Sequence, residues 1–379
     1  MDKKSFFILA AIFFTLSFSV AATAALIPSI ASHFGESPLL AGKLIWIYML
    51  PYGLFALIWS PLSRKFSIKK ILLTALFLFS LFAFIAGVAP NLNFAFLGRL
   101  GMGIFGSCFV PISLIIAGKE LPLETKPKYI GFLFSLSFAS SLLGVFLSGI
   151  LLWRLIYFIP SFLGITTFVV GIYFLKGFNY KGTFKISYFA TLKDRTALKL
   201  FAFIFMGSFL YHGIQQWLGV YLFKQHSFNQ FLISSVFTIS TLTAIFSESI
   251  GGFLASRFGA LKIASLGLLS MSLFIFLLFI FRVPQLIFFI VVFWGLGWAF
   301  NHVGLSSILT SLPDKFLRDA SSLNSSLRFL SGGLGVYLGG KSISLWGFNC
   351  HFLIMAILIF TLGVILKKQF TLVKEEKYG

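Results

Sequence analysis

Acidic residues are scarce in this chain of 379 residues. Only 10 Asp and Glu stand against 30 Lys and Arg, and charged residues of both signs make up 11% of the sequence. An ordinary soluble domain carries roughly 25% charged residues, because charge covers the surface that it exposes to water. The composition therefore excludes a water-soluble globular protein.

Residues that build catalytic or metal sites are also few. Cys108 and Cys350 are the two cysteines, and no cluster of His, Cys and carboxylates has the spacing of a metal site. A pattern like Walker A at 335–342 lies in an apolar stretch, not between the strand and helix that a phosphate-binding loop requires. Around Ser37, the second glycine of a nucleophile elbow is missing. We therefore expect no cofactor, no metal and no enzyme activity.

What the sequence does contain is a succession of apolar stretches. Hydrophobic residues make up 58% of the chain, and twelve runs of 19–27 residues can be counted. At 1.5 Å per residue such lengths cross a hydrocarbon layer of roughly 30 Å, and the absence of strand-like alternation indicates helices. The predicted helices cover residues 6–31, 42–63, 71–90, 93–117, 129–152, 155–175, 198–223, 231–254, 261–281, 285–311, 320–344 and 348–366.

The basic residues gather in alternate loops. With a cytoplasmic N-terminus, 23 of the 30 Lys and Arg fall on the inner side and 5 on the outer side, with Arg99 and Arg328 inside helices. Such an excess marks the cytoplasmic loops of membrane proteins. We therefore expect a multi-pass protein of the bacterial inner membrane or an equivalent plasma membrane, with both termini in the cytoplasm. The net charge of +20 then reflects topology and not nucleic-acid binding.

The longest polar segment, residues 176–197, divides the predicted helices into two sets of six. We interpret it as a cytoplasmic linker between an N-terminal bundle, residues 1–175, and a C-terminal bundle with a short tail, residues 198–379. The loop at 60–72 is echoed 192 positions later at 252–264. Two similar halves are typical of secondary transporters, in which the halves rock around a site near the membrane midplane.

The second of these loops carries four residues of a family signature: Gly252, Leu254, Arg257 and Gly259. The pattern resembles the major facilitator superfamily. In the first loop, Arg64 stands where the signature has an acid and Lys65 where it has arginine, and Ser256 replaces the acid in the second loop. The resemblance covers essentially the whole chain. It implies an all-α membrane protein with twelve transmembrane helices in two pseudo-symmetric six-helix bundles.

Two more helices carry residues that resemble family signatures. Arg99 and Gly103 match an Arg-x-x-x-Gly pattern, and Gly144 and Gly149 have the spacing of a glycine-rich exporter signature, although Val145 stands where that signature has proline. Small residues at such spacing also predict close helix packing in lipid. The resemblance implies the drug/proton antiporter branch. The implied conformational residues are Arg64, Lys65, Gly103, Gly144, Gly149, Gly252, Arg257 and Gly259.

Ionisable side chains within the predicted helices are rare, and each needs a partner or a watery cavity, because an isolated charge costs about 3 kcal/mol to insert. Arg99 is predicted to act as a cavity cation that binds an anionic substrate or responds to a proton-carrying group. The alternative is that it extends its charge toward the outer surface or caps neighbouring carbonyl groups. Glu248 and Arg328 lie at similar depth from the cytoplasmic side. We predict that they form an ion pair, which serves either as a structural contact or as a gate or proton relay.

In the family that this chain resembles, helices one, four, seven and ten line a central cavity. The predicted substrate-cavity residues are Arg99, Tyr211, His212, Gln215, Gln216, Trp294, Trp298, Asn301 and His302. Residues four positions apart share one helix face, so aromatic and polar groups fall together there. Aromatic walls with a few polar anchors suit an amphipathic small molecule. The alternative is that the polar groups only hydrogen-bond between helices.

These observations favour a monomeric secondary active transporter in the lipid bilayer, of the kind that confers multidrug resistance. It would export a small amphipathic organic molecule by alternating access, with protons as the coupling ion. The first and fourth predicted helices carry no Asp or Glu, where many proton-coupled exporters have one, so proton coupling stays open. One alternative is an importer or facilitator of a small anionic solute bound by Arg99. A non-transporting membrane sensor is a more remote alternative.

Overall fold

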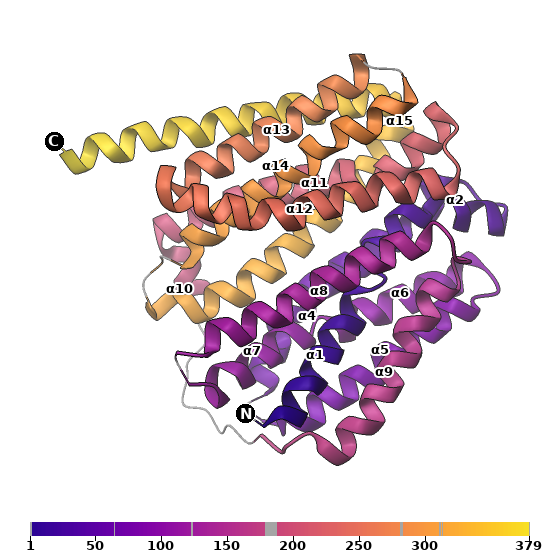
Figure 1. The fold of residues 1–379 in the computed structure, drawn as a ribbon, viewed down its shortest axis with the longest axis vertical. Helices are drawn as coiled ribbons and strands as arrows, with labels where there is room; N and C mark the ends of the chain where they lie inside the picture. Colours follow the sequence, from indigo (N-terminus) through magenta and orange to yellow (C-terminus); the bar gives the residue numbers. More distant parts are fainter. Residues whose placement is uncertain are drawn as a thin grey trace. The chain divides into compact units, whose positions relative to one another are not determined.

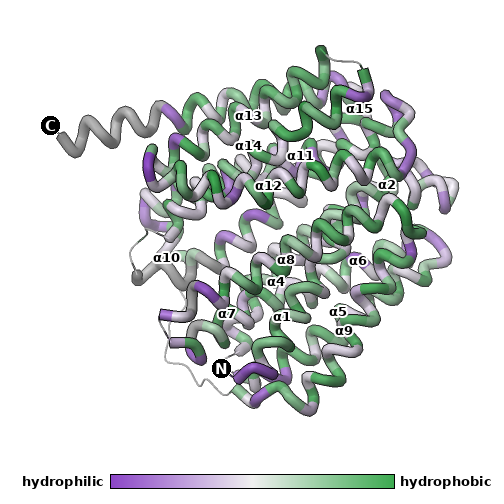
Figure 2. The backbone as a smooth tube through the Cα atoms, in the orientation of Figure 1, coloured by the Kyte–Doolittle hydropathy of each residue, from purple (hydrophilic) through white to green (hydrophobic). Residues whose placement is uncertain are grey.

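The computed structural model describes residues 2–63, 65–122, 124–178, 188–280, 283–310, 312 and 314–378. All regular structure within these ranges is helical, as expected for an all-α membrane protein. The helices form two compact units, Met1–Ile186 and Ser187–Gly379 (Figure 1). Figure 2 shows that hydrophobic residues run along the helices of each unit, while hydrophilic residues gather at many helix ends.

The first unit begins with two short helices where the sequence predicts one. In order, its helices are α1 (Lys3–Ser17), α2 (Ala22–Phe34), α3 (Pro38–Ala41), α4 (Lys43–Leu62), α5 (Ile68–Val88), α6 (Leu92–Gly106), α7 (Phe109–Glu120), α8 (Lys126–Ser148) and α9 (Leu155–Phe174). α1 and α2 are bent by 44° and together pass as one span. The predicted helix over 6–31 is therefore broken at residues 18–21.

Small residues bring α8 onto α1 near that break. The Ser140 hydroxyl donates to the Phe14 carbonyl oxygen at 2.6 Å, and Ser17 and Ser137 share a hydrogen bond. A Cβ atom at Gly144 would overlap the carbonyl oxygen of Phe18. Glycine at 144 thus allows two backbones to touch at the bend, which is how helices associate in lipid.

The second unit contains the longest helices. They are α10 (Tyr188–Lys193), α11 (Arg195–His226), α12 (Gln230–Phe258), α13 (Ala260–Ile280), α14 (Pro284–Thr310) and α15 (Asp314–Tyr378). α13 and α14 pack through glycine: a Cβ at Gly267 would overlap the Gly297 carbonyl oxygen. α10 lies within the predicted linker at 176–197, of which residues 179–187 are outside the described ranges.

α15 consists of two helical arms, and the second arm folds back along the first. Gly347 has φ 76° and ψ 171°, which is not helical and which favours glycine. His351 Nδ1 lies 3.0 Å from Ser342 Oγ, although nine helical residues would separate them by about 13 Å along a straight axis. The chain therefore reverses at Gly347, between the two predicted helices 320–344 and 348–366.

The lengths of the helices bound the number of membrane spans. Among the described residues, 10 helices are long and apolar enough to cross a membrane, or 11 when α1 and α2 count as one. One of these, Ser322–Lys367, has 46 residues, about 69 Å of helix, or roughly twice the hydrocarbon thickness. Counting its two arms separately would give twelve, and that number stays a prediction.

Many of the few polar residues outside the spans cap helices. Asp2, Asn91 and Asn229 each accept a hydrogen bond from the backbone N–H three residues later, at 2.7, 3.2 and 3.0 Å. Such caps satisfy N–H groups that the helix itself leaves unpaired. At Asp2 the backbone hydrogen bond from Ser5 lowers the pKa of the carboxyl below its ordinary value.

Candidate functional site

A group of stacked aromatic side chains in the second unit lies between α11 and α14. The Tyr211 ring stacks on Trp298, with 3.8 Å between centroids and 19° between planes, and on Trp294 at 5.1 Å and 13°. The two tryptophans share one face of α14 because they are one turn apart. Trp294 is fully buried, whereas Trp298 is half-buried, so the stack extends from the interior of the unit to its surface.

A protonatable pair continues this stack. His302 lies one further turn along α14, and its ring stacks on Trp298 at 5.8 Å and 29°. Its Nδ1 is 2.9 Å from Oε1 of Glu248 on α12, with the two side chains 28% and 25% exposed. Both groups are thus partly accessible, and the imidazole that contacts the carboxylate also contacts the aromatic stack.

Arg328 on α15 approaches the same aromatic ring. Its Cζ is 5.9 Å from the centre of the Trp298 ring, and its Nε donates to Asn324 Oδ1 at 2.9 Å. Glu248 is within electrostatic reach, but the described ion pair of that carboxylate is with His302. In this structure the prediction of a Glu248–Arg328 pair is therefore not met. A contact in another conformation stays a prediction.

Of the predicted residues on α11, His212 is half-buried, whereas Tyr211, Gln215 and Gln216 are buried. Gln216 Nε2 is 3.1 Å from His212 Nδ1, one turn away, and the half-buried His212 ring meets Trp298 edge-on at 5.9 Å. Gln215 faces inward, and its Oε1 accepts a hydrogen bond from the indole N–H of Trp294. Gln215 therefore orients the buried end of the aromatic stack.

Asn301 lies inside the second unit and not beside the stack. Its side chain is 1% exposed, and Nδ2 donates to the Ala264 carbonyl oxygen of α13 at 3.3 Å. Neighbouring residues on a helix point about 100° apart, so Asn301 faces α13 while His302 faces α12. For Asn301 the structure favours the alternative interpretation, a hydrogen bond between helices.

Arg99 belongs to the first unit. It lies on α6 and is 1% exposed. Its Nε donates to the Leu44 carbonyl oxygen at 3.1 Å, and its Cζ lies 4.1 Å from the Tyr48 ring and 6.0 Å from the Tyr157 ring. Among the described residues, Nη1 has no hydrogen-bond partner. The side chain is buried between rings and does not extend to the surface.

The glycines implied by the family resemblance differ in what they do. A Cβ at Gly103 would overlap the Tyr48 carbonyl oxygen, so this glycine lets α6 approach α4 one turn from Arg99. Gly259 has φ +95°, which favours glycine, and it ends α12. Gly149 ends α8 with φ −80°. At Gly252 the nearest side-chain atom is 3.9 Å away, and nothing in the structure explains that glycine.

The basic residues of the loop signatures are less constrained. Arg257 is exposed, with its Cζ 5.5 Å from the Phe258 ring. Lys65 is also exposed, and Arg64 lies outside the described residues. Their role in the conformational cycle stays a prediction.

Sequence reasoning missed several partners of the candidate residues. Tyr48 and Tyr157, which enclose Arg99, come from α4 and α9 and carry no pattern that links them to α6. His302 as the partner of Glu248 could have been found by depth, since both lie within about two to three turns of the same end of their helices. Among the described residues, no group of three His, Cys, Asp or Glu could hold a metal ion.

Chemically, the second unit combines an aromatic surface with a group that can gain or lose a proton. The flat face of Trp298 can stack on an aromatic ring of a small molecule. The adjoining imidazole and carboxylate place a nitrogen and an oxygen that can each hold a proton 2.9 Å apart beside that ring.

Comparison with known proteins gives one consistent family. A family model described as Major Facilitator Superfamily matches residues 7–336 and, in a second match, residues 227–377. An MFS-type transporter of Bacillus subtilis, YwfA, is 31% identical over 134 residues, which are 34% of this chain and 32% of that protein. The MFS-type efflux pump MFS1 of Trichophyton rubrum is 29% identical over 133 residues, 34% of this chain and 25% of the pump.

These alignments cover a third or less of each relative's length. A solved structure extends the likeness to the whole chain. The nucleoside transporter NupG has a TM-score of 0.75, with 96% of this chain and 100% of that chain covered, at 15% sequence identity. At that identity the comparison shows the fold alone.

Proposed function

This chain belongs to the major facilitator superfamily, and from that premise we propose that it exports a small amphipathic organic molecule in exchange for protons. It is an integral, multi-pass membrane protein of a family of transporters and not an enzyme. In the proposal it acts as a monomer in the bacterial inner membrane or an equivalent plasma membrane. The substrate binds at the aromatic stack of the second unit, and Glu248 with His302 carries the proton.

One observation carries the proposal: the Trp298 ring contacts both the aromatic residue that would help to bind substrate and the histidine that would help to carry the proton. That ring stacks with Tyr211, and the His302 ring also stacks on it at 5.8 Å, while His302 Nδ1 lies 2.9 Å from Glu248 Oε1. A molecule that stacks on Trp298 therefore changes the surroundings of the pair. If bound substrate changes the proton affinity of the pair by some factor, then by linkage a proton on the pair changes the affinity for substrate by that same factor.

The charges around the pair give the sign of this coupling. The described ionisable groups that face it are Arg328 from α15 and, beyond Trp298, His212 from α11. When the imidazoles are neutral, the charges of Glu248 and Arg328 sum to zero. One bound proton makes the site positive, which repels a cationic molecule and strengthens the hydration of the site. Protonation thus releases a cationic amphiphile, as antiport requires.

The relatives support export without extending over the whole chain. The pump of Trichophyton rubrum is named an efflux pump, and its matched part is a quarter of its length. Conversely, the fold neighbour NupG is named a nucleoside transporter. The proposed direction therefore depends on the chemistry of the site and on experiment.

Proteoliposomes test the proposal directly. With a pH gradient imposed, we expect accelerated movement of at least one member of a panel of aromatic cations, beginning with ethidium. Trp298→Ala should weaken binding of that compound at least about fivefold, because an aromatic stacking contact contributes about 1 kcal/mol beyond the area that it buries. Affinity is measured by equilibrium binding to the purified protein and flux by fluorescence.

Trp346→Ala is the matched control, since that indole is 60% exposed and lies elsewhere in the second unit. It should leave affinity unchanged. If the wild-type protein moves no compound of the panel in response to the gradient, the proposed function is wrong. If Trp298→Ala and Trp346→Ala bind equally well, substrate does not stack on Trp298.

The proposed topology places the side that carries most Lys and Arg in the cytoplasm. A cysteine at Lys193, which is exposed, should then escape a membrane-impermeant thiol reagent in intact cells and react after lysis. A cysteine at the exposed Lys43 should react in both cases. The background should lack Cys350, because that thiol is exposed, whereas Cys108 is buried. Labelling at 193 in intact cells would reverse the orientation.

A second candidate function, uptake of a small anionic solute, is favoured by a different observation. Arg99 is buried with Nη1 unpaired among the described residues, and a guanidinium readily takes a carboxylate. Import driven by Arg99 predicts that Arg99→Lys lowers uptake of organic anions. Export through the aromatic stack predicts no such loss, because this substitution keeps the positive charge on α6 and the stack is in the other unit.

A further inference from the structure

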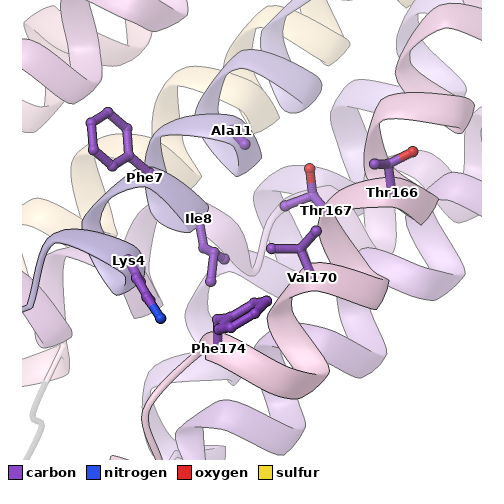
Figure 3. A pocket seen from close by; sticks show the side chains of 8 residues that line it. All are labelled: Lys4, Phe7, Ile8, Ala11, Thr166, Thr167, Val170 and Phe174. Carbon is purple, nitrogen blue, oxygen red and sulfur yellow. The ribbon is translucent and has the colours of Figure 1, made fainter.

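A groove runs between α1 and α9 on the surface of the first unit (Figure 3). Its volume is about 440 Å³. The residues that line it are Lys4, Phe7, Ile8, Ala11, Thr166, Thr167, Val170 and Phe174. Lys4 and Phe174 meet at one end of the groove, so the start of α1 lies beside the end of α9. From there the groove follows α1 toward Ala11.

The wall of this groove is apolar beyond its charged end. Val170 and Phe174 are 40% and 48% exposed, while Gly171 between them turns inward against Leu73 of α5. The Thr166 hydroxyl donates to the carbonyl oxygen of Phe162 in its own helix, at 2.9 Å. Because that hydroxyl is occupied, Thr166 offers the groove mainly its methyl group. Such a surface suits a hydrocarbon chain.

The charged end of the groove is set up for an anion. The Lys4 ammonium lies 4.6 Å above the Phe174 ring, and that ring is its described partner. Two neighbouring lysines are engaged: Lys69 Nζ donates to the Ile172 carbonyl oxygen at 2.8 Å, and Lys176 Nζ is 3.4 Å from Asp2 Oδ2. The Asp2 carboxylate is thus held by Lys176, and Lys4 is the charged residue among those that line the groove, so this end of the groove is positive.

We propose that this groove binds an anionic phospholipid, with one acyl chain between α1 and α9 and the phosphate at the Lys4 ammonium. Two features together select this ligand. An apolar groove favours burial of methylene groups, and the Lys4 ammonium at its end favours a negatively charged headgroup. A headgroup that carries its own ammonium would meet positive charge at the same place. The groove belongs to the first unit alone, whereas the proposed aromatic site belongs to the second.

Occupancy would add a link between α1 and α9, two helices of the first unit that already pack against each other. α1 is a short helix that breaks at residues 18–21, and its N-terminal half is held to α9 along the groove. An acyl chain between them adds contacts to both helices. The bound lipid therefore stabilises the folded first unit by mass action, since the unfolded segment offers no groove.

Thermal unfolding of the purified full-length chain tests this proposal. Phosphatidylglycerol should raise the midpoint temperature by about 5 °C more than phosphatidylcholine with the same acyl chains. Lys4→Gln should remove at least half of that difference by weakening the headgroup contact. Ala11→Phe should do the same by filling the groove, while it leaves every charge in place. Lys43→Gln, an exposed lysine at another helix, is the control and should keep the full difference.

A second measurement does not depend on stable variants. Phosphatidylglycerol with a photoreactive acyl chain should crosslink to peptides from 3–17 and 155–174, and unlabelled phosphatidylglycerol should compete, but glycerol phosphate should not. Equal stabilisation by the two lipids, or an unchanged difference in both Lys4→Gln and Ala11→Phe, would overturn the site. Crosslinks spread evenly over all spans would mean general annular lipid. Competition by ethidium would assign the groove to substrate instead.

Discussion

Replacing Glu248 by Gln is expected to abolish the acceleration of transport by an imposed pH gradient. The amide fills the space of the carboxylate beside His302 but cannot carry a charge, so the pair loses the proton that couples it to the gradient. Coupling between two ligands of one protein is typically 5- to 150-fold, and we expect gradient-driven flux to fall by about tenfold or more. Substrate binding at the stack should change by less than about threefold, because Trp298 and Tyr211 remain.

Glu36→Gln provides the matched control, because this carboxylate is exposed and follows the end of α2, in the first unit. It should retain the response to the gradient. Retention of that response in Glu248→Gln would eliminate the proton relay and leave a structural pair. Loss of substrate binding together with loss of flux would instead show that the carboxylate holds the aromatic stack in place.

A double-mutant cycle separates the two possible partners of Glu248. Groups in direct contact couple by about 0.5–3 kcal/mol, whereas independent sites add within about 0.5 kcal/mol. The observed 2.9 Å contact predicts coupling between Glu248→Gln and His302→Gln in the free energy of unfolding. Stronger coupling between Glu248→Gln and Arg328→Gln would mean that Arg328 becomes the partner in another conformation.

Gly144→Ala is expected to be among the most destabilising single methyl additions in the first unit. The added Cβ would overlap the carbonyl oxygen of Phe18, and backbone cannot move aside as a flexible side chain can. Such overpacking typically costs 1–3 kcal/mol, so we expect a loss of about 2 kcal/mol. The midpoint temperature of thermal unfolding should fall, and the rate of transport should fall with it, because α8 can no longer pack closely against the bend after α1.

The same helix offers a control for this substitution. A Cβ at Gly131 on α8 would meet no atom within 4 Å, so Gly131→Ala should be tolerated or should stabilise the helix by up to about 1 kcal/mol. Both variants change helix propensity equally. Equal unfolding temperatures for the two would refute the close contact at Gly144, and a lower temperature for Gly131→Ala would reverse the assignment of the packed face.

The sequence could predict much of the fold because the bilayer restricts the possibilities. The length of each apolar stretch, its helical structure and the uneven distribution of Lys and Arg between loops can all be predicted by counting along the sequence. The family signatures then indicated the superfamily, which the family model confirms. Breaks in the helices were harder to predict: at the bend after Ser17 the backbone of Phe18 packs against Gly144, a contact between residues more than a hundred positions apart.

At the candidate site, the sequence by itself determined which side chains share a helix face. Spacing by four placed Trp294 with Trp298 and His212 with Gln216, because 3.6 residues complete a turn. The tertiary structure decided which way each face turns. It directed His302 to Glu248 and Asn301 into the interior toward α13. Depth along a helix can be counted from the chain, but rotation about its axis is set by packing against neighbours, and only the folded structure supplies those neighbours.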